Sequence, residues 1–158
     1  MSGLRRTGRM QSALQLDDRF RWGLYAIFAV LFVTGAVWLI ADSQRDDANG
    51  EFWQAVSAAL LMIHGGGAMV VLILLGALIP IHIRRAWLSR KNRLTGIVMA
   101  AANVLLVVTA FGLYYAGSDG LRAWTSDAHI AVGLAFPIVI FVHVLTGRRT
   151  SRGAKSRT

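Results

Sequence analysis

Four long stretches of the chain are apolar, and polar residues are concentrated in the segments between them. The stretches cover about residues 23–41, 53–83, 94–115 and 128–146, and none of them contains Asp, Glu, Lys or Arg. About 20 consecutive apolar residues are enough to cross the ~30 Å hydrocarbon core of a bilayer. Four such helices in a water-soluble bundle would leave no polar face for solvent. The pattern therefore predicts an all-α fold, a transmembrane four-helix bundle.

The segments outside the four runs set the expected domain limits. The connections of roughly 11 to 13 residues predict antiparallel neighbours in up-down order. We expect one transmembrane domain over residues 21–149. A segment over 1–20, disordered or lying on the membrane surface, precedes it, and a basic, disordered tail over 150–158 follows. The first 22 residues lack the apolar core of a cleavable signal peptide, so the first run is expected to remain as an anchor.

Charge predicts how the helices are oriented. The net charge is +9, and five Lys or Arg residues precede the first run, five lie between the second and third, and five follow the fourth. Only Arg45 and Arg122 lie in the other two connections. The positive-inside rule then predicts both termini in the cytoplasm, which suits a bacterial inner membrane. Basic runs could also bind nucleic acid, but topology and anionic lipid explain them, and we expect no nucleic-acid partner.

All four histidines lie within apolar runs, where an ionisable side chain is costly and usually functional. His64 and His82 belong to the second run, and His129 and His143 to the fourth. On continuous α-helices the first two, 18 residues apart, are separated by five whole turns, and the other two, 14 apart, are about 40° from facing the same way. Each pair therefore shares a helix face. Helix direction predicts an outer level with His64 and His129 and an inner level with His82 and His143.

Two imidazoles at each level suit the two axial positions of a haem iron. Ligands on facing helices of a bundle can hold the flat ring between them. The chain has no cysteine, which excludes thioether attachment of a c-type haem and cysteine-ligated iron–sulfur clusters. The sequence thus predicts two haem b groups, bis-His ligated by His64/His129 and His82/His143, whose task is electron transfer.

Glycines and prolines near the histidines fit this interpretation. Three glycines in a row cost about 1 kcal/mol each in a helix, and a haem face against bare backbone or close helix packing would offset that cost. The glycines predicted to lie at haem depth are Gly65, Gly66, Gly67 and Gly133, with Gly35, Gly112, Gly23 and Gly96 on the histidine-free helices. Pro80 and Pro137 are expected to bend their helices and aim the flanking ligands.

Cations at both ends could bind haem propionates through charge-assisted hydrogen bonds. Arg84, Arg85 and Arg148 follow the inner histidines, and Arg122, with Tyr114 or Tyr115, is the outer candidate. Topology alone would also place arginines at the inner ends. Asn103 and Thr109, polar residues within the third run, are explained by helix hydrogen bonding.

These motifs resemble the cytochrome b561-like clan of four-helix di-haem membrane cytochromes. The similarity covers about residues 21–149 and rests on His64-Gly-Gly-Gly-Ala-Met, His82-Ile-Arg-Arg-Ala-Trp, Arg93-Leu-Thr-Gly and the 14-residue histidine spacing of the last run. In the clan's formate dehydrogenase and hydrogenase subunits the first helix supplies one ligand, whereas here the first run has no histidine. Two histidines on the second and fourth helices are similar to the haem-bearing half of respiratory cytochrome b. The resemblance implies a quinone and a redox partner protein.

Our hypothesis is therefore a di-haem b-type cytochrome that carries electrons within or across the membrane, with any enzymatic activity belonging to a complex. One alternative is a haem-free protein that uses its histidines for metal binding or proton-coupled transport. A metal site would gather its ligands around one point, and a proton path would need intramembrane carboxylates. A second alternative is an assembly subunit whose histidines only hydrogen-bond between helices.

Overall fold

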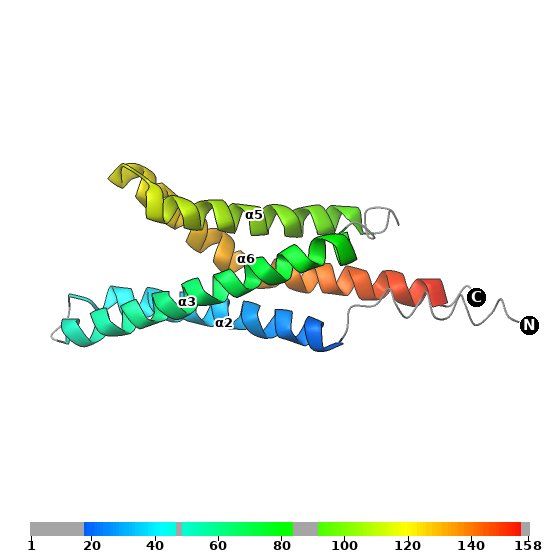
Figure 1. Cartoon of the computed structure of the whole chain (residues 1–158), viewed down its shortest axis with the longest axis horizontal. Coiled ribbons are helices and arrows are strands. Elements are labelled where there is room, and N and C mark those ends of the chain that lie inside the picture. Colours follow the sequence, from blue (N-terminus) through cyan, green and yellow to red (C-terminus); the bar gives the residue numbers. More distant parts are fainter. Residues whose placement is uncertain (1–17, 47–48, 84–91, 156–158) are drawn as a thin grey trace, which may run out of the picture. The chain divides into compact units, whose positions relative to one another are not determined.

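The computed structural model describes residues 18–46, 49–83 and 92–155, and these ranges are helical and contain no strand. Four helices are long and apolar enough to cross a membrane: α2 (Asp18–Ser43), α3 (Gly50–Leu78), α5 (Arg93–Tyr115) and α6 (Asp119–Lys155) (Figure 1). The shortest, α5, has 23 residues and is about 35 Å long at 1.5 Å per residue, more than the hydrocarbon core requires. The predicted all-α transmembrane fold class is confirmed.

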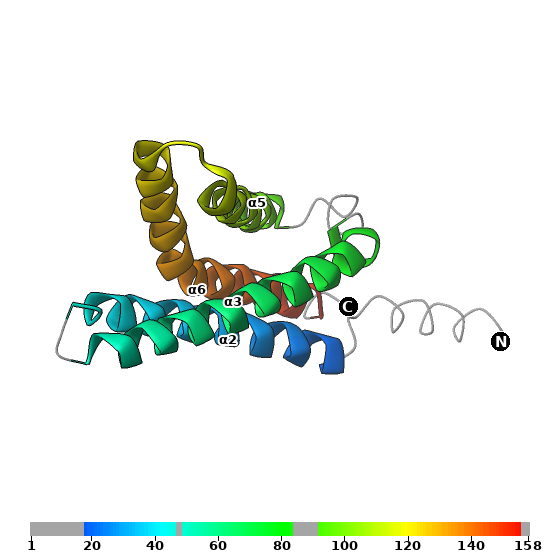
Figure 2. The same cartoon turned by 60° about the vertical axis from the view of Figure 1, so that its left-hand side comes forward.

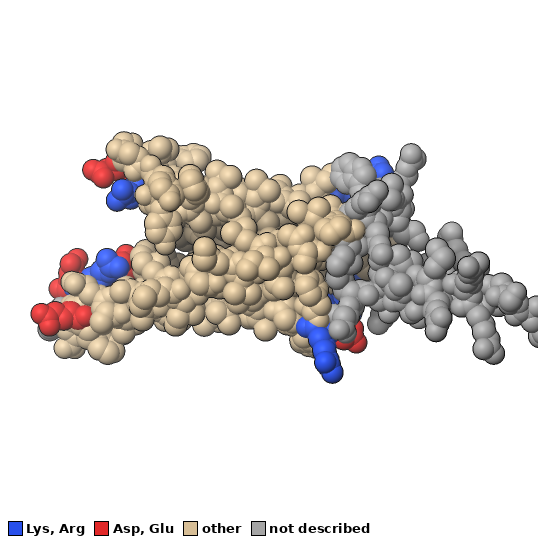
Figure 3. All heavy atoms as spheres, viewed as in Figure 1, with Lys and Arg blue, Asp and Glu red and all other residues tan. Residues whose placement is uncertain are grey.

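Charged side chains lie at the ends of the helices. Figure 3 shows the described Lys, Arg, Asp and Glu residues at the helix ends, with an uncharged surface between them. Two of the end positions are short-range ion pairs, Arg21 with Asp18 at 3.0 Å and Arg45 with Asp42 at 2.8 Å. The long faces instead expose large apolar side chains such as Ile73 and Val108. A lipid environment would accept these faces, and the chain has the character of a multi-pass membrane protein.

The chain divides into two compact units, Met1–Arg85 and Ala86–Thr158, each built on one helical hairpin, where the sequence predicted a single domain. In the first unit α2 and α3 lie side by side (Figures 1 and 2). A Cβ added at Gly67 would lie 3.1 Å from Leu31 Cδ2, so this glycine lets the two helices approach closely. A Cβ at Gly50 would clash with the backbone carbonyl of Arg45, so the turn into α3 depends on a residue without a side chain.

In the second unit α5 packs against α6. A Cβ added at Gly112 would lie 2.7 Å from Thr125 Cγ2, which makes this the closest approach of α5 to α6 among the described glycines. At the other end of the hairpin, Asn92 takes the left-handed conformation that begins α5, and its Oδ1 lies 2.9 Å from the Thr150 hydroxyl. Figure 2 shows a bend within α6, the helix that contains Pro137. Proline is the usual cause of such a bend.

The second run does not continue as one α-helix. It changes after Leu78 to a π-helical segment, η1 (Ile79–Ile83). Pro80 explains the change, because it has no N–H to donate to the preceding turn and its ring clashes with the carbonyl four residues earlier. The wider π turn winds the chain by less per residue. The expectation that His64 and His82 are separated by five whole α-helical turns therefore does not hold.

Helix α6 also differs from expectation at its end. It continues to Lys155, into the tail over 150–158 that the composition predicted to be disordered. Basic residues in this segment favour a helix C-terminus, because they complement the negative end of the helix dipole. The segment over 1–17 and residues 156–158 lie outside the described residues.

Candidate functional site

His64 is held between α3 and α2. Its half-buried imidazole reaches across to α2, where Nδ1 lies 3.0 Å from the Thr34 hydroxyl. The backbone carbonyl of Leu31 is a further hydrogen-bond partner of the ring. Gly35 lies against the same edge, since a Cβ there would lie 3.3 Å from Cε1 and 3.6 Å from Nδ1. The absence of a side chain at position 35 therefore leaves room for the imidazole to reach Thr34.

The hydrogen bonds of Thr34 assign the proton on His64. The hydroxyl has one proton, and it donates to the Val30 carbonyl one turn earlier at 2.7 Å, a usual length for O–H···O. The hydroxyl oxygen must then accept from Nδ1–H, and 3.0 Å is a usual N–H···O length. The network thus assigns the proton to Nδ1 and makes Nε2 the basic nitrogen. Nε2 lies on the part of the ring that faces away from Thr34.

The same arrangement recurs in the second hairpin. His129 Nδ1 lies 2.9 Å from the Thr109 hydroxyl, and that hydroxyl donates to the Leu105 carbonyl at 2.7 Å. His143 Nδ1 lies 3.3 Å from the Thr95 hydroxyl, which donates to the Asn92 carbonyl at 3.2 Å. These last two distances are longer, so the contact of His143 is weaker. Each histidine whose side chain is described thus turns Nδ1 toward a threonine of the neighbouring helix.

The two pairs of the second hairpin follow from one register. Thr95 and Thr109 are 14 residues apart on α5, and His129 and His143 are 14 residues apart on α6. In an antiparallel pair of helices, equal spacing brings both threonines opposite a histidine at once. This match was the signal in the sequence that could have predicted the contacts. Helix hydrogen bonding alone is enough only for Asn103, whose amide donates to the Met99 carbonyl at 2.8 Å.

The glycines near the histidines have different neighbours. Gly67 is buried and packs against α2, and a Cβ at Gly133 would be in ordinary contact with Leu106 of α5, at 3.9 Å. A Cβ at Gly65 or Gly66 would meet no atom within 4 Å outside its own stretch of helix. Helix packing therefore accounts for Gly67, and Gly65 and Gly66 present bare backbone on an open part of α3.

The remaining candidate residues are less informative. Arg84 and Arg85 lie outside the described residues, and so does the side chain of His82. Arg122 reaches back to the Ala116 carbonyl at the end of α5, at 3.5 Å, and Arg148 is exposed. Tyr114 and Tyr115 are exposed as well, and the ring of Tyr115 stacks on Phe111 with centroids 4.4 Å apart.

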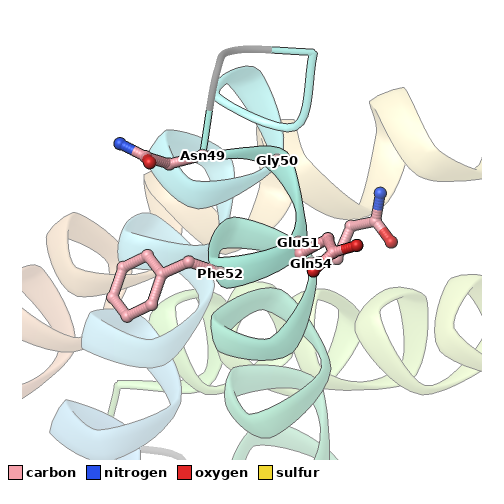
Figure 4. Close-up of a pocket in the computed structure, with 5 residues that line it drawn as sticks. All are labelled: Asn49, Gly50, Glu51, Phe52 and Gln54. Carbon is pink, nitrogen blue, oxygen red and sulfur yellow. The ribbon is translucent and has the colours of Figure 1, made fainter.

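A surface depression at the start of α3 does not form a site. Its lining residues are Asn49, Gly50, Glu51, Phe52 and Gln54. Figure 4 shows the Phe52 ring on one side of the helix and the Glu51 and Gln54 side chains on another, so they do not converge on a ligand. Within residues 18–46, 49–83 and 92–155, no three His, Cys, Asp or Glu side chains form a group that could hold a metal ion.

Comparison with known proteins found no match to this chain, whether among family models, curated proteins or solved structures. The resemblance to di-haem cytochromes therefore rests on the sequence motifs alone.

Proposed function

We propose that this chain is a di-haem b-type membrane cytochrome that transfers electrons within or across a bacterial inner membrane. The observation that carries the proposal is the set of histidines on apolar helices, three of them with Nδ1 on a threonine hydroxyl. Metal-ligating histidines almost always donate the other ring N–H to a neighbouring acceptor, which fixes the ring and its tautomer. An imidazole protonated at Nδ1 offers Nε2 to iron.

Several features of the chain fit haem as the group to be bound. The candidate ligands are neutral imidazoles in apolar helices, and Gly65 and Gly66 next to His64 leave the surface of α3 open to a flat ring. We propose that His64 and His129 ligate one iron and His82 and His143 the other. Iron with two axial imidazoles exchanges one electron and has no open position for oxygen chemistry. Transfer between a quinone pool and a redox partner protein is the part of the proposal that comes from the family resemblance.

The test is the visible spectrum and haem content of the full-length protein purified in detergent. We expect an α-band typical of haem b after dithionite reduction and two haems per chain. H64A and H129A should each lose one haem, and the remaining spectrum should be the same in both. N103L is the matched control, because Asn103 is an intramembrane polar residue bonded only within its own turn among the described contacts, and it should keep both haems.

Metal analysis separates the proposal from its alternatives. Iron at two atoms per chain supports the cytochrome. Zinc without iron would support metal binding by the histidines, and neither metal would leave them as hydrogen-bonding groups between helices. Either of the last two results would overturn the proposal.

A further inference from the structure

Three threonines of the histidine-free helices stand in one chemical relation to the histidines. Thr34, Thr109 and Thr95 each lie on the helix that pairs with the histidine-bearing helix of the hairpin, and each has its hydroxyl at a histidine Nδ1. A threonine within a helix needs only its bond to the preceding turn. The second contact, repeated at all three histidines whose side chains are described, calls for another explanation.

We propose that Thr34, Thr109 and Thr95 are positioning residues that hold His64, His129 and His143 in the Nδ1–H tautomer and so present Nε2 to haem iron. The inference rests on the proposed function. In each relay the hydroxyl spends its proton on a backbone carbonyl of its own helix, and its oxygen can then only accept from the imidazole. The peptide groups of α2 and α5 thereby determine which ring nitrogen is basic.

The relays differ in strength. At Thr34 and Thr109 the donated bond is 2.7 Å and the contact with Nδ1 is 3.0 or 2.9 Å. At Thr95 the corresponding distances are 3.2 and 3.3 Å. Because short, well-aligned bonds restrain a ring more strongly, Thr34 and Thr109 should matter more than Thr95. Gly35 adds a restraint on the first relay, since its Cα surface limits how far the His64 ring can tilt toward α2.

The first test needs no substitution. Nitrogen-15 NMR of histidine-labelled, dithionite-reduced protein reports which ring nitrogen carries the proton, because bis-imidazole ferrous haem is diamagnetic. We expect Nδ1–H for His64, His129 and His143. A proton on Nε2 of His64 or His129 would overturn the proposal. The same measurement reads the tautomer directly if the protein holds no haem.

The second test replaces the threonines. T34V and T109V remove the acceptor and keep the shape, whereas T34S and T109S keep a hydroxyl and are the matched controls. We expect the valine variants to bind haem roughly 10- to 100-fold more weakly and the serine variants to be close to wild type. The midpoint potential of the affected haem should rise in the valine variants, because a less basic imidazole stabilises ferric iron less. T95V should show a smaller change of both kinds.

The two proposals fail separately. Nδ1–H histidines in a protein without haem would refute the cytochrome and keep the tautomer assignment. Two haems with valine variants that match wild type in affinity and potential would keep the cytochrome and refute the positioning role of the threonines.

Discussion

At the scale of single residues, the threonines show what a sequence pattern leaves undetermined. A threonine in an apolar helix is already explained by a bond to the turn before it, as the 2.7 Å contacts of Thr34 and Thr109 illustrate. Only the register between helices decides which threonine meets which histidine. The histidines could therefore be chosen as candidates from the sequence, whereas their hydrogen-bond partners required the hairpins. Two buried polar atoms, Trp38 Nε1 and Ser57 Oγ, have no partner within the described residues, and nothing in the structure explains them.

Gly35 provides a prediction at this scale. In G35A the new methyl group would lie 3.3 Å from His64 Cε1, so the ring must shift by a few tenths of an ångström and its bond to Thr34 must lengthen. We expect weaker binding of one haem, measured by haem titration, and an unchanged second haem. G23A is the control on the same helix, because a Cβ there meets no atom within 4 Å. Equal haem affinity in the two variants would contradict the role assigned to Gly35.

At the scale of helices, the apolar runs predicted the existence and type of the elements well and their ends less well. Helix α3 begins at Gly50 and α6 at Asp119, before the apolar runs, because helices extend into polar caps that hydropathy does not register. Pro80 was expected to bend its helix, but the sequence did not show that the chain would form a π turn around it. Proline removes a backbone bond wherever it stands, and the surrounding structure decides how the helix adapts.

Gly112 allows the packing of α5 on α6 to be tested. G112A would place a methyl group 2.7 Å from Thr125 Cγ2, and a β-branched side chain within a helix has little freedom to move away. We expect the free energy of unfolding in mixed detergent micelles to fall by about 1–3 kcal/mol. G96A on the same helix meets no atom within 4 Å and should be neutral or stabilising by up to about 1 kcal/mol. A stabilised G112A variant would mean that the two helices are not in close contact there.

At the scale of the whole molecule, the sequence predicted a multi-pass membrane protein because the property concerned is additive along the chain. Length and hydropathy of each helix are local, and all four helices meet the requirement for crossing a membrane. Orientation depends on the charge asymmetry, 15 basic residues in three segments against two in the other connections, and it remains a prediction. Ligation of each haem by one histidine from each half of the chain depends on long-range assembly and is likewise a prediction.

The orientation can be measured with single cysteines, because the chain has none of its own. We expect Q44C and S118C to react with a membrane-impermeant maleimide in intact spheroplasts. S156C should react only after the cells are lysed, since both termini are predicted to lie in the cytoplasm. Labelling of S156C in intact spheroplasts would reverse the assigned topology.

The equal spacing of Thr95 and Thr109 with His129 and His143 constrains how this hairpin can change in length. Residues added to the turn over 116–118 leave both contacts in place, because they alter neither interval. One residue added within either interval turns everything beyond it by about 100° and separates one threonine from its histidine. Insertions and deletions should thus be tolerated in the turn and selected against in the 14-residue intervals, which makes interval length a criterion for recognising distant relatives of this chain.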